Sequence, residues 1–403
     1  MKYRIVAVQQ PFDLNDVCRG DGFLFVRNNA GHAARGIAVQ CSGDNVSDLL
    51  SSLQQAPESL PGSPLAFGLV PFLPTSQATF FVPHATFSIY EDGSRSLTLI
   101  GETDNDLDDN AVSRAISEAL APVAVPAVAG SYSVSPATPI NTYLTAVTAA
   151  RDAVRRGDIQ KAVIARDIDV TSETPFNIHG VLLRLRSSFG SSYRFCIDNM
   201  IGASPELLVQ VDGRTVRSHP LAGTAPRTGD PDTDARLAAD LIASTKNQIE
   251  HRVVIDMVHD TLLPHCSYLD WEAEPSIVTV ANVQHLGTAI EGALAEPVPN
   301  VLQLVRALCP TPALGGSPSR EAIDLIVQHE GFERGNYGGA VGWVDANGNG
   351  TFAVTIRCAE LNADRTRARL FAGGGIVAES EPLAELAETQ AKFQAMLSAL
   401  IRP

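Results

Sequence analysis

The stretch that decides the fold lies near the C-terminus and reads Leu370-Phe-Ala-Gly-Gly-Gly-Ile-Val-Ala-Glu379-Ser-Glu-Pro-Leu-Ala-Glu385-Leu-Ala-Glu388-Thr-Gln-Ala-Lys392. It predicts an apolar strand, a turn of three glycines, and a helix that begins with Ser380 as its N-cap. Glycine backbone lets an anion approach closely and meet N–H groups. On the helix, Glu385, Glu388 and Lys392 are spaced three and four apart and therefore share one face. This arrangement indicates a hard cation beside an anionic ligand, and a solvated charged face is the alternative.

The same helix has a second, apolar face that we expect to pack on the sheet. Its members recur at helical spacing and are Leu383, Leu386, Phe393, Leu397 and Leu400. The separation of the charged face from the apolar face predicts a helix that covers a core with one side and serves a site with the other.

The composition restricts the class of protein. Of the 403 residues, 45% are hydrophobic and 19% are charged, which is enough apolar material for a sizeable core. No uninterrupted apolar run reaches about 18 residues, so we expect no membrane partner. The first ten residues lack the apolar centre of a secretory signal, which predicts a cytoplasmic protein. The net charge of −15 would repel a phosphate backbone, so we expect no nucleic-acid partner, and an anionic substrate would need local cations or N–H groups.

Strand and helix patterns divide the chain into two parts. Residues 1–130 contain several strand-like runs and a predicted helix at 111–120, but no motif that carries chemistry. Residues 121–139 resemble a connection, because they are rich in Ala, Pro and Ser. The second part contains predicted helices at 142–156, 233–244, 246–263 and 301–308, strands at 161–170 and 193–197, and a meander over 339–372. Hairpin strands with grouped helices favour an α+β fold of layered, largely antiparallel sheets flanked by helices.

Two charged residues of the second part each have two interpretations. Lys161 opens an otherwise apolar strand, where a lone lysine is more often a solvated edge residue than a functional group. Glu250 lies early in the helix predicted at 246–263, where it either complements the helix dipole or binds a ligand. The residues themselves leave both alternatives open.

A series of stretches in the second part, in this order, resembles the chorismate-utilising enzymes, and the isochorismate synthases most closely. The stretches are Lys161-Ala-Val-Ile-Ala-Arg166, Gly202-Ala-Ser-Pro-Glu206-Leu-Leu, Pro220-Leu-Ala-Gly223-Thr224, Glu250-His251, Gln284-His-Leu-Gly-Thr288, Pro310-Thr-Pro-Ala313, Tyr337-Gly-Gly-Ala-Val-Gly342, Thr355-Ile-Arg357-Cys-Ala, the glycine turn and Glu385…Glu388…Lys392. The resemblance implies one large domain with the fold of that family. Residues 1–130 would complete the sheet layers, and residues 140–403 would form the chorismate-binding catalytic part.

The resemblance also implies a role for each matched residue. Lys161 corresponds to the general base that activates a water molecule at C2 of chorismate, and Glu206 to the general acid that protonates the departing C4 hydroxyl. Glu250 and Glu388 correspond to ligands of Mg²⁺, and Glu385 to an acid that supports the metal through water. Substrate contacts are implied for Gly223, Thr224, His285, Ala313, Leu314, Tyr337, Arg357, Gly374, Gly375 and Lys392, among which the arginine pairs with the enolpyruvyl carboxylate.

The implied activity is Mg²⁺-dependent isomerisation of chorismate to isochorismate, an isomerase reaction of the hydroxymutase type, for a catechol siderophore, menaquinone or a related product. Relatives that install ammonia carry glutamine at the position of Lys161, and the aminodeoxychorismate branch carries lysine at that of Ala222, so no glutamine amidotransferase subunit is expected. Salicylate synthases, the alternative, carry threonine where this chain has Ala313. Asn247 and Gly374 depart from close relatives, which often carry an acid and an alanine there.

A catalytically silent scaffold with this fold is the alternative of a different class. Such a protein would need neither the acid–base pair nor the acidic pair implied to bind metal. The chain retains all four residues: Lys161, Glu206, Glu250 and Glu388. Their joint presence therefore favours an enzyme.

Overall fold

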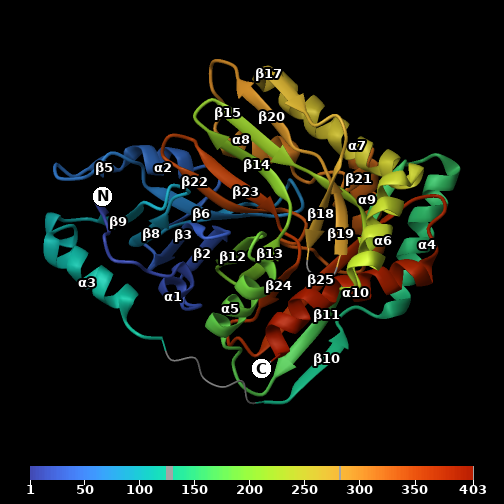
Figure 1. Cartoon of the computed structure of the whole chain (residues 1–403), viewed down its shortest axis with the longest axis horizontal. Helices are drawn as coiled ribbons and strands as arrows, with labels where there is room; N and C mark the ends of the chain where they lie inside the picture. The colour runs from blue at the N-terminus through green and yellow to red at the C-terminus, as the bar shows by residue number, and fades with distance from the viewer. Residues whose placement is uncertain (124–129, 281–282, 403) are drawn as a thin grey trace.

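Two large antiparallel sheets and one small sheet form the frame of the protein in a computed structural model, which describes residues 1–123, 130–280 and 283–402 (Figure 1). The largest sheet has 13 strands in the order β10 (Tyr132–Pro136), β11 (Lys161–Ser172), β25 (Arg367–Ile376), β24 (Cys358–Leu361), β13 (Met200–Ser204), β12 (Tyr193–Ile197), β2 (Phe23–Arg27), β3 (Ala30–Arg35), β8 (Ala85–Ile89), β9 (Arg95–Gly101), β1 (Lys2–Ala7) and β5 (Gln54–Gln55), with β21 (Gly316–Ser317) beside β11. Within it the β1–β5 pair is parallel.

The second large sheet has nine strands, and the third sheet has three. The nine-stranded order is β17 (Cys266–Trp271), β20 (Ile290–Leu294), β15 (Thr215–His219), β14 (Leu207–Asp212), β23 (Gly350–Val354), β22 (Ala340–Asp345), β6 (Leu65–Val70), β7 (Thr79–Val82) and β4 (Val39–Ser42). The small sheet consists of β16 (Leu221–Pro226), β19 (Val283–Gly287) and β18 (Ser276–Val280).

Ten α-helices and two short 3₁₀ turns connect these strands in the described ranges. The helices are α1 (Leu14–Cys18), α2 (Val46–Ser52), α3 (Asp109–Leu120), α4 (Ile140–Arg156), α5 (Ile178–Phe189), α6 (Pro231–Ala243), α7 (Thr245–Leu262), α8 (Val301–Leu308), α9 (Ser319–His329) and α10 (Pro382–Ile401), and the turns are η1 (Asp104–Asp106) and η2 (Leu263–His265). None of the helices in the described ranges combines the length and apolar character that a membrane crossing requires.

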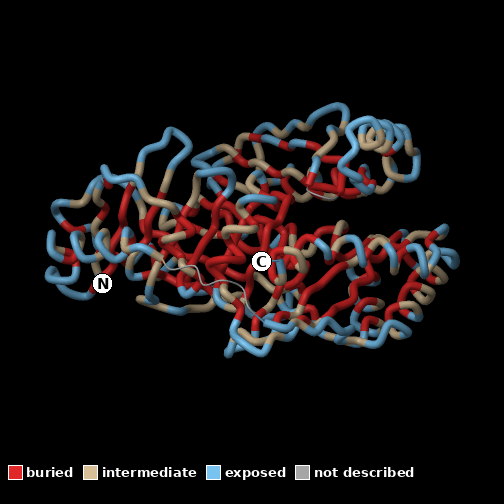
Figure 2. Tube along the Cα trace, turned by 60° about the horizontal axis from the view of Figure 1, so that its bottom comes forward, coloured by how far each residue is buried: buried red, intermediate tan, exposed pale blue. Residues whose placement is uncertain are grey.

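Both large sheets contain strands from the N-terminal and the C-terminal parts of the chain. In the 13-stranded sheet β12 pairs with β2, and in the nine-stranded sheet β22 pairs with β6. The main core lies between the two sheets, where Phe23 of β2 stacks on Phe67 of β6 at 5.5 Å between ring centres. Buried residues accordingly gather inside the layers, and exposed residues on the loops and outer helix faces (Figure 2). The predicted α+β fold with layered, largely antiparallel sheets is confirmed.

Helices cover the outer face of the 13-stranded sheet. Phe393 and Leu400 of α10 are buried in a second apolar core with residues of α1 and α5. Helices α4 and α9 pack on β11 around a third core. Helix α4 ends as predicted at Gly157, whose left-handed backbone (φ +81°) a residue with a side chain rarely adopts. This packing fixes β11 and α10, which carry most of the charged residues predicted at the site.

Several local predictions were wrong. The helices α1, α2, α5 and α9 were not predicted, and α7 begins at Thr245, with Ser244 as its N-cap, instead of at the predicted residue 246. The predicted connection at 121–139 contains the edge strand β10, whose sequence Tyr-Ser-Val-Ser-Pro alternates but is short, mostly exposed and rich in Ser and Pro, as a connection is. Residues 124–129 lie outside the described residues. The meander segment 352–360 is divided between β23 and β24, so the chain passes from one large sheet to the other at Arg357.

The prediction that the three glycines form a turn was also wrong. Gly373, Gly374 and Gly375 lie inside strand β25 and pair with Ala165, Ile164 and Val163 of β11. Helix α10 begins at Pro382 with Glu381 as its N-cap, and Ser380 instead donates a hydrogen bond of 2.8 Å to Glu385. Leu383 is 71% exposed, so the predicted apolar face begins further along the helix than expected.

Candidate active site

A polar cavity of about 240 Å³ lies where strands β11, β16, β19 and β25 meet helices α7 and α10. Every site residue predicted from the sequence lines it, except Gly374. Gly373, the first glycine of the predicted turn, lines it as well, and Lys246 is a lining residue that was not predicted. Lys246 is the direct neighbour of Asn247, and chain adjacency is the one signal that could have found it.

Glu206 is a buried acid at one side of the cavity. It directly precedes strand β14 and is 3% exposed, and its Oε1 accepts a hydrogen bond of 3.4 Å from the amide of Leu221. Burial raises the pKa of Glu206 to about 7, although the Leu221 amide, Arg357 and Lys161 act in the opposite direction. The carboxyl group can therefore retain its proton near neutral pH, as a general acid requires.

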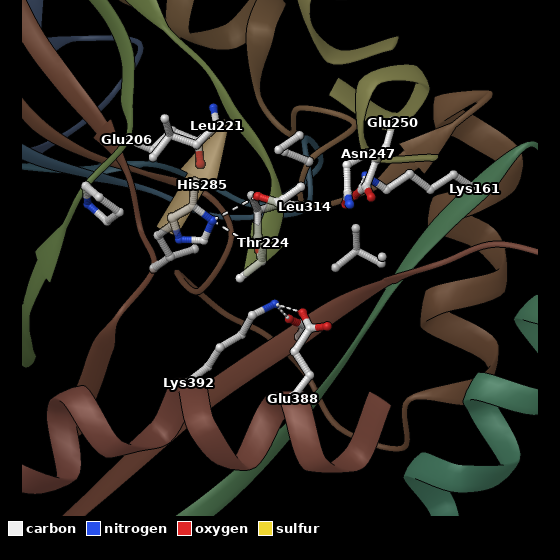
Figure 3. A pocket seen from close by; sticks show the side chains of 18 of the residues that line it. Lys161, Glu206, Leu221, Thr224, Asn247, Glu250, His285, Leu314, Glu388 and Lys392 are labelled. Atoms are coloured by element: carbon white, nitrogen blue, oxygen red, sulfur yellow. Dashed lines mark hydrogen bonds and ion pairs between the residues drawn. The ribbon is translucent and has the colours of Figure 1, made fainter. Parts of the chain in front are cut away.

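Lys161 lies across the cavity from Glu206 (Figure 3). It is 5% exposed, and β21 pairs with the first residues of β11, so the interpretation as a solvated edge residue is wrong. Its Nζ donates to Oε1 of Glu250 at 2.7 Å. Burial acts to raise the pKa of Glu250, but Lys161, Lys392 and Lys246 outweigh it and lower the pKa below its usual value. Glu250 therefore faces these lysines as a carboxylate.

The glycines of β25 allow this crowded arrangement. A Cβ atom added to Gly375 would lie 2.7 Å from Cε of Lys161 and 3.0 Å from Oε1 of Glu250. A Cβ atom on Gly374 would lie 2.7 Å from Oε2 of Glu385. None of the three glycines has a positive φ, so close approach, not a turn, explains their presence.

The ladder between β25 and β11 determines where the glycine amides point. The amide of Val163 donates to the carbonyl of Gly315, on the far side of β11 from β25. Val163 and its partner Gly375 thus form a non-hydrogen-bonded pair, and the N–H of Gly375 points away from β11. Gly375 lines the cavity, so its amide is a candidate donor to an anion there.

Helix α10 contributes a charged face from the other side. Glu385 is 8% exposed; burial and the neighbouring Glu388 raise its pKa, although the Ser380 hydroxyl and nearby lysines oppose them. Glu388 pairs with Lys392 at 2.7 Å, and Nζ of Lys392 also donates to the carbonyl of Gly373 at 2.7 Å. These residues face the cavity, so the interpretation as a solvated charged face does not hold for Glu385.

The carboxylate oxygens near the glycines are suitable ligands for a hard cation, but they do not form a complete coordination shell. Within the described ranges, no three acidic, histidine or cysteine side chains are close enough together to bind one ion. Glu250 and Glu388 are each paired with a lysine and would have to exchange that partner for the ion. Two carboxylates with the remaining positions filled by water and substrate are typical of Mg²⁺.

His285 and Arg357 form the anion-facing wall between β19 and β24. Nη2 of Arg357 lies 3.3 Å from Nε2 of His285, and Nδ1 of the same ring lies 3.2 Å from the carbonyl of Gly223. Because a guanidinium only donates, Nε2 accepts and Nδ1 carries the proton. Burial, Arg357 and Lys392 lower the pKa of His285 to about 3, which keeps the ring neutral.

Arg357 also has a left-handed backbone, with φ of +50°. A residue with a side chain adopts this conformation only when its surroundings enforce it, and such residues cluster at functional sites. The carbonyl of Arg357 accepts from the amide of Ala203 at 3.1 Å, which ties the bend to β13 just before Glu206. The bend therefore couples the position of the arginine to that of the acid.

A buried ion pair under the cavity was not predicted from the sequence. Arg334 and Glu330 have side chains 2% and 1% exposed and are hydrogen-bonded to each other. Arg334 also donates to the carbonyls of Leu314 at 2.8 Å and Val163 at 2.7 Å, and Glu330 accepts from the amide of Ala165 at 2.7 Å. The pair thus fixes the loop after Ala313 to the strand that carries Lys161.

Fold and cavity together define an enzyme that acts on a small anion. An acid and a lysine face each other across a cavity whose cations include Lys246, Lys392 and Arg357. The chain belongs to the chorismate-binding enzymes, because the family described as "Chorismate binding enzyme" matches residues 44–401.

Several proteins of known name are similar to this chain over most of its length. The isochorismate synthase DhbC of Bacillus subtilis (strain 168) is 34% identical over 383 residues, which are 90% of this chain and 89% of that protein. The crystal structure of DhbC from Bacillus anthracis is 31% identical with a TM-score of 0.81, covering 96% of this chain and 98% of that one. MenF, the menaquinone-specific isochorismate synthase of Escherichia coli, has a TM-score of 0.86 at 24% identity over 99% of this chain and 94% of that one, which shows a common fold.

Proposed function

We propose that this protein is an isochorismate synthase, which isomerises chorismate to isochorismate. The observation that carries the proposal is the placement of buried Glu206 and Lys161 on opposite sides of one cavity. The reaction needs one group that removes a proton from water at C2 and another that gives a proton to the C4 hydroxyl. Two proteins that are similar to nearly the whole chain, DhbC of Bacillus subtilis and DhbC of Bacillus anthracis, are named as isochorismate synthases, and these names support the same activity for this chain. We expect the product to supply a catechol siderophore, menaquinone or a related metabolite.

The proton transfers follow from the two residues. As the oxygen of water bonds to C2, Lys161 accepts its proton, the ring double bonds shift, and the C4–O bond breaks. Glu206 donates its proton to the departing oxygen, which leaves as water. Lys161 must give up its ion pair with Glu250 before its nitrogen can accept a proton, because in that pair it is a donor. Proton exchange with solvent restores the starting states.

Cations and amides of this chain offset the charge of the substrate. Chorismate carries two carboxylates, and the protein has a net charge of −15. Arg357 offers a planar guanidinium suited to one carboxylate, while Lys392 and the amide of Gly375 face the other part of the cavity. Neutral His285 accepts from Arg357 and so orients its guanidinium.

Glu250 and Glu388 would hold Mg²⁺, with Glu385 supporting it through water. When bound, the ion supplies positive charge that neutralises and orients a substrate carboxylate. The donor chemistry supports this assignment, because carboxylate oxygens are the ligands that Mg²⁺ prefers. The lysine partners of both glutamates would be released toward the substrate.

The pH dependence should reveal Glu206. A general acid works only when protonated, so we expect kcat/KM to fall as pH rises through about 7, the pKa to which burial raises Glu206. The slope should approach a tenfold loss per pH unit. In Glu206→Gln the residual rate should lack this limb. A limb that persists unchanged in the variant would assign the titration to another group.

The product should depend on Ala313. Forming salicylate requires a folded conformer of isochorismate that transfers its C2 hydrogen to the departing enolpyruvyl group. A methyl side chain at Ala313 offers no hydroxyl to hold that conformer, so the unmutated protein should release little pyruvate. Ala313→Thr should raise the pyruvate fraction about fivefold, the effect of a hydrogen bond worth roughly 1 kcal/mol.

Pyruvate is followed directly by coupling the reaction to lactate dehydrogenase. Ala313→Ser is the matched control that adds a hydroxyl without the methyl group of threonine. Stoichiometric pyruvate from the unmutated protein would instead favour the salicylate synthase alternative.

A further inference from the structure

A second cavity lies on the outer face of the 13-stranded sheet, near α1 and α5. Along β12, Tyr193, Phe195 and Ile197 belong to the core between the two large sheets, while Cys196 belongs to the core on the outer face. Because strand side chains alternate, Arg194 lies on the outer face as well. The cavity has a volume of about 350 Å³ and is lined by Arg194, by Arg186 and by the apolar residues Phe12, Leu14, Val26 and Ile89.

Arg194 is buried there without a carboxylate partner. It is 2% exposed and donates to Oδ1 of Asn15 at 3.3 Å and to the carbonyl of Asn28 at 2.9 Å. Its Nε is buried and has no hydrogen-bond partner in the described chain, although a guanidinium carries five N–H donors. None of the described acidic side chains lies within the 4.0 Å that defines an ion pair with it. A buried charge without a partner destabilises the folded state, so Arg194 is expected to have a role that offsets this cost.

The carboxylate that lines this cavity already has a cationic partner. Asp13 is hydrogen-bonded to Arg186, and its Oδ1 accepts from the amide of Asn15 at 2.8 Å. Burial and the positive charge of Arg186 lower the pKa of Arg194 to about 10, so the guanidinium of Arg194 remains charged at neutral pH. Among the residues that line this cavity, two cations therefore face one anion, in a protein with a net charge of −15.

We propose that this cavity binds a small organic acid through a carboxylate at Arg194 and an apolar, ring-sized body against Phe12, Val26 and Ile89. The planar guanidinium matches a carboxylate, and Arg186 adds a second donor at the rim. The volume is at the lower end of the range for small-ligand sites, which fits a single-ring acid better than a peptide. The site is separate from the catalytic cavity, since the two share no lining residue.

The test is a calorimetric titration of the full chain with benzoate, with acetate and inorganic phosphate as comparison anions. Benzoate should bind at least about tenfold more tightly than acetate, because its ring buries apolar surface that acetate lacks. Arg194→Met should weaken benzoate binding about tenfold or more. Arg357→Met, which alters the catalytic cavity, should leave this binding unchanged.

A second variant keeps the test decisive if Arg194→Met does not fold. The side chain of Arg186 is 41% exposed, so Arg186→Met should fold. It should also weaken benzoate binding, because Asp13 is then free to pair with Arg194. The proposal would be overturned if the unmutated protein did not bind benzoate, if Arg194→Met and Arg186→Met bound benzoate as tightly as the unmutated protein, or if only Arg357→Met lost binding. Acetate or phosphate binding as tightly as benzoate would reduce the site to one for simple anions and contradict the role of the apolar wall.

Discussion

Replacing Glu206 by glutamine should lower kcat by about 10²–10⁴-fold, the usual contribution of a positioned proton donor, and Lys161→Ala should cause a loss in the same range. Glutamine is close in size to glutamic acid but cannot give up a proton, so the departing C4 oxygen would leave without protonation. The binding of chorismate should largely survive in both variants. Steady-state kinetics with chorismate and Mg²⁺, together with a direct binding titration, measure the two effects separately.

Matched controls for these variants lie on the surface. Glu291 pairs with Arg217 with its side chain 62% exposed, and Lys2 is likewise part of a surface ion pair. Glu291→Gln and Lys2→Ala should retain full kcat. Weakened chorismate binding with unchanged kcat in the Glu206 and Lys161 variants would make these residues carboxylate contacts or structural groups instead.

Removing either proposed metal ligand should abolish most of the Mg²⁺-dependent activity. Glu388→Ala and Glu250→Ala each delete a carboxylate, and each removes the ion-pair partner of a lysine, Lys392 and Lys161 respectively. We expect a loss at least as large as the roughly 10–100-fold typical of removing an outer-shell partner of a metal. Activity as a function of Mg²⁺ concentration and calorimetric Mg²⁺ binding are the measurements, and circular dichroism checks the fold.

Glu381→Ala provides the control on the same helix, because Glu381 is an exposed N-cap residue without a side-chain capping bond. Its Mg²⁺ dependence should match that of the unmutated protein. Full turnover by Glu388→Ala in the absence of Mg²⁺ would contradict the metal assignment.

The glycines of β25 show why the sequence predicted a turn where the structure has a strand. Three consecutive glycines are typical of a turn, and their backbone angles here are those of a strand. The need for glycine arises from Lys161 and Glu250, which lie on top of that backbone and are 214 and 125 positions away from Gly375 in the sequence. A close approach between such distant segments leaves no local signal.

Lys161 illustrates the same limit. A lysine at the start of a strand is usually solvated, and this one is buried because β21 pairs at its strand edge and its side chain lies against Glu250 and Gly375. The buried pair of Glu330 and Arg334 was not predicted because its hydrogen bonds reach carbonyl and amide groups in other segments of the chain. By contrast, the motifs recognised in the sequence contain nearly all residues that line the cavity. The hairpin patterns correctly predicted the α+β class. Both features depend on residues that are close together in the sequence.

Water should add at C2 of chorismate while the C4 hydroxyl departs, and the product formed in ¹⁸O-labelled water tests this most directly. The purified protein, incubated with chorismate and Mg²⁺, should yield isochorismate with the label in its C2 hydroxyl, as seen by mass spectrometry and NMR. Isochorismate without ¹⁸O, or recovery of unchanged chorismate from a folded protein, would contradict the account.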